Sequence, residues 1–144
     1  MEVGIEGKDN NQLKAAVEEM VMASRSDGMG ISALKNAGLK LLILSKERNP
    51  VVARRAEKLQ IEVIQACDNK LEALTEWLSK NQLPLSQCAY VGNDINDLQC
   101  MQAVKLAIAP IDAHPLATQA AHWRLTRAGG KGAIRELSDA IINC

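Results

Sequence analysis

Apolar residues gather along this chain in short runs separated by longer amphipathic segments. Within each run the apolar residues are nearly continuous, whereas a half-exposed strand would alternate apolar and polar positions. Continuous runs of this length are typical of strands that are covered on both faces of a sheet. The pattern predicts four such strands, at Lys40–Leu44, Glu62–Gln65, Cys88–Val91 and Lys105–Ala109.

The segments between these runs have the spacing of amphipathic helices. In the clearest of them, Leu71, Leu74 and Leu78 recur at three- and four-residue intervals and share one face. Asn49 before Pro50 is a typical helix start, and a glycine such as Gly38 is a typical helix stop. The predicted helices are Gly28–Asn36, 50–59, Asn69–Lys80, Asp97–Val104 and Gly132–Ile142.

Strands and helices alternate from residue 28 onward, which favours right-handed crossover connections and a mostly parallel sheet. We therefore predict a single α/β domain over residues 1–144, Rossmann-like, with helices on both faces of the sheet. The residues before Met20 fit either a helix or a hairpin arm that ends in Met20–Ala23. Pattern alone leaves both readings open.

Composition excludes several classes of function. The 17 basic and 17 acidic side chains cancel, so no overall field attracts nucleic acid or an anionic membrane. No apolar stretch approaches the length of a membrane span, and the first ten residues lack the pattern of a signal peptide. Cys67, Cys88, Cys100 and Cys144 are scattered and form no CxxC pair, which indicates reduced thiols and a cytoplasmic setting.

Polar residues that could bind a ligand or take part in catalysis follow the predicted strands. Ser45 and Lys46 come after one strand, and Asp68-Asn69-Lys70 precedes a helix after the next. Ligands gather at the carboxyl ends of parallel strands, so these groups are expected at one edge of the sheet. A hydroxyl and ammonium groups at that edge suit a phosphate monoester.

A third polar cluster, Gly92–Asp97, follows the strand Cys88–Val91. Asn93, Asp94 and Asp97 offer the hard oxygen ligands that Mg²⁺ prefers. Taken alone, this sequence is more typical of a helix cap than of a metal site, and Lys70 alone is more typical of a solvated lysine at a helix start. Their shared position at the sheet edge favours the functional reading.

Five blocks of sequence resemble, in order, the capless phosphatases of the haloacid dehalogenase superfamily. Within it, the chain is similar to the group that acts on eight- and nine-carbon sugar acids, and to the phosphatase-like tail of acylneuraminate cytidylyltransferases. The resemblance runs from about Glu19 to the C-terminus. The blocks are LLILSKERNPVVARRAEKLQIEV, DNKLEALTEWL, AYVGNDINDLQCMQAV, AIAPIDAHPLA and AGGKGAIREL.

The resemblance implies a role for several residues. Ser45 matches the hydroxyl that holds the transferring phosphoryl group, and Lys70 matches the lysine that neutralises its charge. Asn93 and Asp94 match the Mg²⁺ loop, and Asp97 matches the residue that supports it. Three further positions are implied as substrate-binding through the first helix and the C-terminal glycine loop, with Lys46 beside Ser45. They are Arg25, Asp27 and Arg135.

The resemblance also implies an N-terminal hairpin and no cap domain, so residues 1–23 are expected to hold a degenerate first motif and the hairpin. In the family that motif is Asp-x-Asp-Gly-x-x-Thr, and its first aspartate attacks phosphorus. Aligned without gaps, the motif falls on residues 1–7, where only Gly4 agrees. Met1 stands at the nucleophile position and Val3 at the acid–base position. Neither side chain has the chemistry required.

Three interpretations follow from the missing aspartates. The chain is a Mg²⁺-dependent sugar-acid phosphatase whose true motif is encoded upstream, or a pseudoenzyme that binds phosphate or a phosphorylated sugar acid with weakened or lost Mg²⁺. Alternatively, it is a non-catalytic assembly domain of sialic-acid and cytidylyltransferase metabolism. Losing the central strand would leave sheet edges unpaired, which predicts that Met1–Ile5 or a partner chain fills the gap. A homo-oligomer is therefore expected, tetrameric by resemblance.

Overall fold

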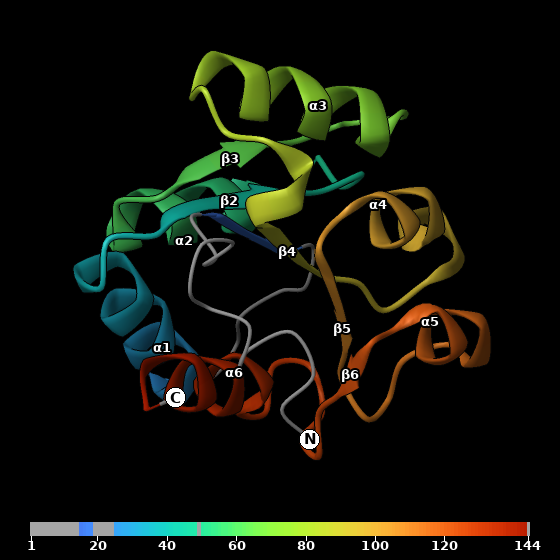
Figure 1. The fold of residues 1–144 in the computed structure, drawn as a ribbon. Coiled ribbons are helices and arrows are strands. Elements are labelled where there is room, and N and C mark those ends of the chain that lie inside the picture. Colours follow the sequence, from blue (N-terminus) through green and yellow to red (C-terminus); the bar gives the residue numbers. More distant parts are fainter. Residues whose placement is uncertain (1–14, 19–24, 49, 144) are drawn as a thin grey trace.

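A six-stranded parallel sheet forms the centre of the molecule (Figure 1). The computed structural model describes residues 15–18, 25–48 and 50–143. The strand order is β3-β2-β1-β4-β5-β6, and every neighbouring pair is parallel. The strands are β1 (Ala15–Glu18), β2 (Lys40–Leu44), β3 (Glu62–Ile64), β4 (Cys88–Val91), β5 (Leu106–Ala109) and β6 (Trp123–Arg124).

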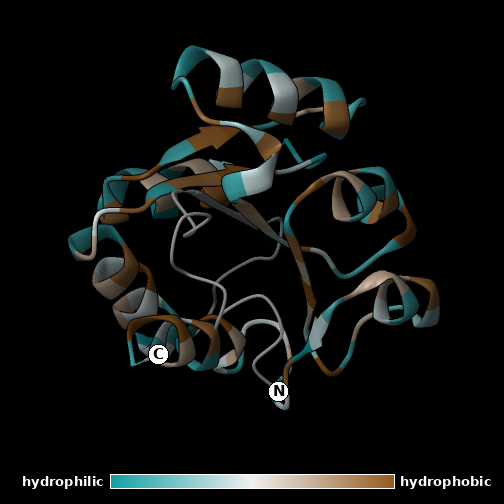
Figure 2. Ribbon diagram, in the orientation of Figure 1, coloured by the Kyte–Doolittle hydropathy of each residue, from teal (hydrophilic) through white to brown (hydrophobic). Residues whose placement is uncertain are grey.

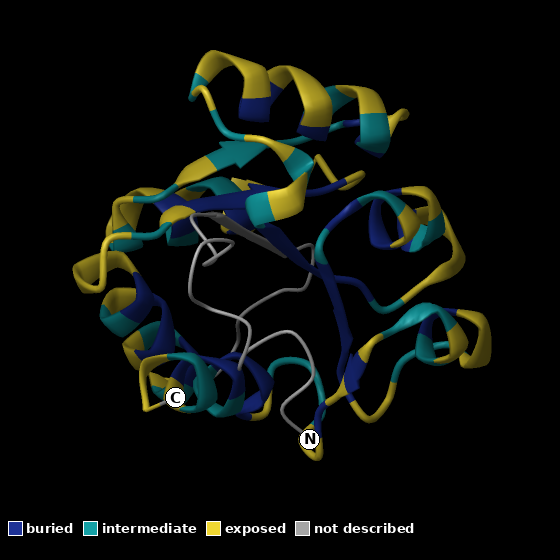
Figure 3. Ribbon diagram, in the orientation of Figure 1, coloured by how far each residue is buried: buried dark blue, intermediate teal, exposed yellow. Residues whose placement is uncertain are grey.

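Helices cover both faces of this sheet, as the sequence predicted. On one face α1, α2 and α6 bury a cluster that includes Ile31, Val52 and Ile134 against β2, β4 and β5. On the other, α3, α4 and α5 bury a cluster around Leu74 and Met101. Figures 2 and 3 show apolar, buried helix surfaces turned toward the sheet. The helices are α1 (Arg25–Asn36), α2 (Pro50–Leu59), α3 (Lys70–Lys80), α4 (Leu98–Ala103), α5 (Pro115–Ala120) and α6 (Ala133–Ile142).

The local signals in the sequence place most elements correctly. Asn69 caps α3 by accepting a hydrogen bond from the Glu72 amide at 3.0 Å. The helix predicted over Asp97–Val104 begins as a short 3₁₀ turn, η2 (Ile95–Asp97), before α4. A second 3₁₀ turn, η1 (Leu85–Gln87), precedes β4. No described helix is long and apolar enough to cross a membrane.

The predicted hairpin is wrong for Ala15–Glu18. These residues form β1, the central strand, which pairs in parallel with β2 on one side and β4 on the other. Strands β2 and β4 are almost wholly buried, so unpaired backbone groups on their facing edges would be costly. The apolar Ala-Ala-Val stretch of β1 satisfies both edges. Met1–Ile5, predicted to fill this gap, lies outside the described residues, as does the rest of the predicted hairpin.

Candidate functional site

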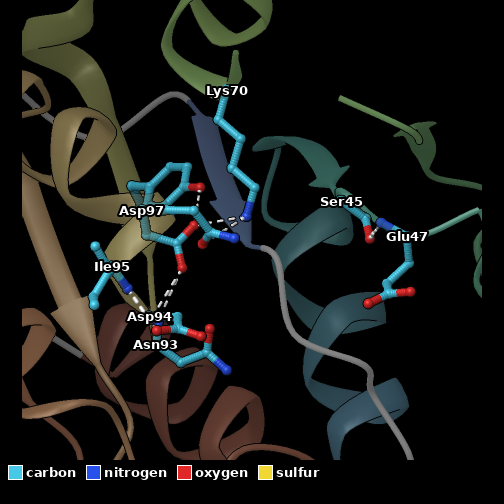
Figure 4. A network of polar contacts seen from close by, with 9 residues as sticks. Ser45, Glu47, Lys70, Asn93, Asp94, Ile95 and Asp97 are labelled. Carbon is cyan, nitrogen blue, oxygen red and sulfur yellow. Dashed lines mark hydrogen bonds and ion pairs between the residues drawn. The ribbon is translucent and has the colours of Figure 1, made fainter. Parts of the chain in front are cut away.

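The candidate site lies where β2 and β4 end and α3 begins (Figure 4). Chain segments far apart in the sequence meet there because parallel strands all end at the same edge of the sheet. Ser45 follows β2, Lys70 is the first residue of α3, and Gly92–Asp97 follows β4. The structure thus brings the three predicted clusters to one edge.

Lys70 and Asp97 form a buried ion pair at this edge. The Lys70 ammonium nitrogen lies 3.0 Å from Asp97 Oδ1, and the two side chains are 3% and 0% exposed. Asp97 Oδ1 also accepts a hydrogen bond of 2.6 Å from the Tyr90 hydroxyl. The ammonium donates further to Asn96 Oδ1 at 3.4 Å. Its position is therefore fixed by two residues of the loop after β4.

The second oxygen of Asp97 shapes that loop. Asp97 Oδ2 accepts hydrogen bonds from the backbone amides of Asn93 at 3.0 Å and Asp94 at 3.2 Å. Asp94 in turn caps η2, since its Oδ1 accepts from the Ile95 amide at 2.7 Å. Asp97 uses both oxygens on Lys70, Tyr90 and the loop backbone. Asp97 therefore supports the loop backbone. Asp94 is also a helix cap, as the sequence alone suggested.

The side-chain oxygen of Asn93 is the feature of this site that is relevant to metal binding. Its side-chain oxygen Oδ1 is buried and has no hydrogen-bond partner among the described residues. A buried polar atom without a partner is costly, and a cation would satisfy it. Asp94 is exposed and adds carboxylate oxygen beside it. Within the described residues no three His, Cys, Asp or Glu side chains group as a metal site. Asn93 and Asp94 therefore fit Mg²⁺, which keeps several water ligands.

A hydrogen bond holds the loop after β4, Gly92–Asp97, against the next loop at this edge of the sheet. The His114 amide donates to the Asn93 carbonyl at 2.9 Å. The following loop is linked in the same way, because the Gly129 amide donates to Asp112 Oδ1 at 3.0 Å. The loops after β4, β5 and β6 thus form a connected rim, which fixes the backbone of Asn93 from its outer side.

Ser45 lies across the end of β1 from this network (Figure 4). It is 2% exposed, and its hydroxyl oxygen accepts from the Glu47 amide at 3.0 Å. Its backbone is tied to the next strand, because the Ser45 amide donates to the Ile64 carbonyl at 2.9 Å. Among the described residues the Ser45 hydroxyl accepts this hydrogen bond and donates none. Lys46 and Glu47 are exposed.

Three residues assigned to substrate binding by resemblance make their described contacts outside this network. Asp27 is wholly buried in α1 and accepts from the amides of Gly132, Ile134 and Arg135, at 3.0 to 3.3 Å, so it caps the start of α6. The Arg135 guanidinium pairs with Asp139 at 3.1 Å on the exposed side of α6. Arg25 lines a groove between α1 and α2. None of these contacts involves the loop after β4.

Sequence reasoning missed Tyr90 and Asn96. The apolar pattern of β4 makes Tyr90 one more strand residue, although a buried tyrosine hydroxyl needs a partner and Asp97 lies seven residues later. Its pairing with a nearby acidic loop is a signal that could have been used. Met1 and Val3, assigned to the family's catalytic positions, lie outside the described residues.

Comparison with known proteins gives a consistent result. The family description for haloacid dehalogenase-like hydrolases matches residues 31–136. The 3-deoxy-D-manno-octulosonate 8-phosphate phosphatase of Yersinia pestis is 36% identical over 126 residues, covering 87% of this chain and 67% of its own. N-acylneuraminate cytidylyltransferase A of Danio rerio is 31% identical, over 89% of this chain but only 30% of its own length.

Solved structures agree with the sequence matches. The Yersinia pestis phosphatase superposes with a TM-score of 0.91 at 29% identity, over 98% of this chain and 86% of that one. The Moraxella catarrhalis phosphatase was solved in complex with magnesium, phosphate and KDO. It superposes with a TM-score of 0.89 at 26% identity, over 99% of this chain and 92% of that one.

Proposed function

Because the chain belongs to the haloacid dehalogenase-like hydrolase family, we propose that it binds a phosphorylated sugar acid at the carboxyl edge of its sheet without hydrolysing it. It would be a pseudoenzyme of the sugar-acid phosphatase type. The similarity to 3-deoxy-D-manno-octulosonate 8-phosphate phosphatases supports the ligand class. The ligand's phosphate would occupy the space between Ser45 and Lys70.

The hydrogen-bond and ion-pair network around Lys70 is the main support for the proposal that the chain binds a phosphorylated ligand. A buried ammonium at the end of a parallel sheet favours an anion, and the ion pair with Asp97 holds that ammonium in place. The Ser45 hydroxyl supplies a donor on the other side of β1. Positioned donors of this kind need little reorganisation when a phosphate binds.

Mg²⁺ is the proposed cofactor, with Asn93 Oδ1 and an oxygen of Asp94 as its protein ligands. When bound, the ion would neutralise phosphate charge and complete its shell with water. Asn93 is neutral where an aspartate would carry a charge, so we expect binding weaker than at a fully acidic loop. Loop geometry does not depend on the ion, because Asp97 already holds the Asn93 and Asp94 amides.

We expect no hydrolysis, because the chain lacks an aspartate that could attack phosphorus. The ungapped alignment puts Met1 at the position of the family's attacking aspartate, and methionine cannot attack phosphorus. The central strand β1 offers no replacement aspartate, because residues 15–24 contain none. Asp97 reaches Lys70, but both of its oxygens accept hydrogen bonds already. It therefore lacks the free lone pair that attack on phosphorus requires.

A weaker second candidate, a phosphatase with a substituted nucleophile, is favoured by the position of Glu18. This residue ends the central strand in register with Ile43 and Val91. Ser45 and Asn93 follow those two partners by two residues. By this register, the backbone position of Glu18 is at the edge of the sheet at which Ser45 and Lys70 lie.

The test combines a binding assay with a hydrolysis assay. Phosphate and 3-deoxy-D-manno-octulosonate 8-phosphate are titrated calorimetrically with and without Mg²⁺, and phosphate release is followed from the same sugar phosphate and from p-nitrophenyl phosphate. We expect binding that Mg²⁺ strengthens, and no release above that of Asp94→Ala. Release that is lost in Glu18→Gln would establish the second candidate. Absence of binding by both anions would refute the proposal.

Asn93→Asp is the matched gain-of-function variant. A second carboxylate at the metal loop should tighten Mg²⁺ binding, seen as a larger rise in melting temperature on adding the ion. Gln102→Glu adds the same charge on the exposed side of α4 and should leave the Mg²⁺ response unchanged. Equal responses of the two variants would remove Asn93 from the proposed metal site.

The proposal also includes a cellular compartment and an oligomeric state. Three buried free thiols, at Cys67, Cys88 and Cys100, support a reducing, cytoplasmic compartment. The match to a cytidylyltransferase that is much longer than this chain supports an alternative role as an assembly domain. A homo-oligomer, tetrameric by resemblance, is proposed in both cases. Sedimentation velocity tests it, and a monomer at micromolar concentration would exclude the assembly role.

A further inference from the structure

A groove of about 670 Å³ lies between α1 and α2, on the opposite side of β2 from Lys70. Its size is in the range of small-molecule sites. Gly28 and Ala33 of α1 and Leu59 of α2 form an apolar part of its lining, called its floor below. A Cβ built on Gly28 would stand 3.7 Å from Leu59 Cδ2, so the glycine leaves space where a larger side chain would fill the groove.

The charged residues that line the groove, among those the structure describes, are basic: Arg25, Arg55 and Lys58. The whole chain has a formal net charge of zero, so the two exposed cations Arg25 and Lys58 beside one cavity are a local excess. Arg25 and Lys58 are exposed, which leaves both heads able to turn toward a ligand. Such a surface raises the local concentration of anions.

The groove also offers neutral hydrogen-bonding groups. Ser32 and Asn36 stand one and two helical turns beyond Gly28 on the lining face of α1. The groove is braced near the end of α1, because the Lys35 ammonium donates to the Gln60 carbonyl at 2.8 Å and so ties α1 to the residue after α2. An apolar floor, a hydroxyl, an amide and a basic rim occur together.

From this combination we propose that the groove, defined by Arg25, Gly28, Ser32, Asn36, Lys58 and Leu59, binds a small organic anion with an aromatic or apolar body. The body would lie on the floor at Gly28 and Leu59, and its phosphate or carboxylate would meet the basic rim. This site does not depend on the proposed function, because none of its residues belongs to the Lys70 network.

Adenosine monophosphate is a suitable probe, because it joins a flat base to one phosphate. Adenosine and inorganic phosphate serve as its two halves. We expect the monophosphate to shift the amide resonances of Gly28, Ser32 and Asn36, and each half to shift these same resonances only at higher concentration than the whole. Adenosine binding as tightly as the monophosphate would refute the role of the cations.

Substitutions locate the binding. Arg25→Gln with Lys58→Gln removes two exposed charges and should weaken adenosine monophosphate binding about tenfold. Lys80→Gln removes a matched exposed charge from α3 and should have no effect. Unchanged binding in the double variant, or resonance shifts confined to 93–97, would overturn the proposal.

Discussion

The Lys70 ammonium and the Asp97 carboxylate meet at 3.0 Å inside the protein, although 27 residues separate them. This pair joins the start of α3 to the loop after β4, and so links two segments at the carboxyl edge of the sheet. The cost of losing the pair measures how strongly it organises the site.

Asp97→Asn should destabilise the protein by about 3–5 kcal/mol, the usual cost of removing one partner from a buried ion pair. The asparagine keeps the size of the side chain but leaves the Lys70 ammonium buried without its counter-charge. It also weakens the acceptor for the Asn93 and Asp94 amides. Urea denaturation followed by circular dichroism measures the change in the free energy of unfolding.

The control is Asp139→Asn on the exposed side of α6. Asp139 pairs with Arg135, but the two side chains are 56% and 40% exposed. Exposed pairs contribute about 0–1 kcal/mol, so this variant should stay close to the parent. If Asp97→Asn is equally mild, the Lys70–Asp97 pair does not organise the site.

A second prediction concerns the contact between α1 and α6. A Cβ on Gly30 would stand 2.9 Å from the Arg135 Cα and 3.0 Å from the Ile134 carbonyl oxygen, both of them backbone atoms that cannot move aside. Gly30→Ala should therefore cost about 1–3 kcal/mol through overpacking. The same urea denaturation measures it.

Gly28→Ala is the matched control in the same helix. The new methyl group would meet only Leu59 Cδ2, at 3.7 Å, an ordinary contact. Because alanine favours the helix over glycine, this variant should gain about 0.5–1 kcal/mol. Opposite signs for the two alanines would establish the close approach of α1 to α6, and equal signs would contradict it.

The sequence alone could predict those parts of the fold that are encoded locally. Lys40–Leu44 and Cys88–Val91 are apolar runs long enough to identify buried strands, and Asn69 is a cap within three residues of its partner. Asp27 is different. Its three partners lie at least 105 residues away, so its role as the cap of α6 was invisible in the pattern around it.

In the candidate site, too, the sequence predicts the positions of the residues but not their long-range contacts. Ser45, Lys70 and Asn93 could be placed at one edge because the topology of a parallel sheet brings strand ends together. The partners of each side chain could not, since the Tyr90–Asp97 and Lys70–Asp97 bonds depend on how deeply α3 and the loop after β4 are buried. Resemblance implied substrate-binding roles for Arg25 and Arg135, and these stay predictions, because their described contacts lie on α1 and α6 and outside the Lys70 network.

Buried thiols lead to a pH prediction. Burial raises the pKa of Cys88 to about 12 and that of Cys100 to about 11, from an ordinary 9.0. The unfolded chain therefore loses these protons at lower pH than the folded protein. Their contribution to stability is complete below pH 9 and is lost as the pH rises toward 11 and 12.

Stability measured between pH 8 and 11 should fall, and the fall should be smaller in Cys88→Ala with Cys100→Ala. In a Cys144→Ser background, iodoacetamide at pH 8 should label neither thiol until urea unfolds the protein, because the thiolate is the reactive form. Rapid labelling of Cys88 in the folded state would contradict its burial. Lys80→Gln reports any general effect of high pH on the fold.

The last prediction tests β1, where sequence and structure part most clearly. A run of Ala-Ala-Val-Glu carries weak strand signal, and only the need of β2 and β4 for a shared partner selects it. A central parallel strand donates its amides alternately to both neighbours, so consecutive amides are protected. Ala16, Val17 and Glu18 should then exchange with deuterium about as slowly as Leu42 and Tyr90. In an outer hairpin arm, every second amide would face solvent and exchange fast, and that alternating pattern in the amide spectra would return Ala15–Glu18 to the hairpin.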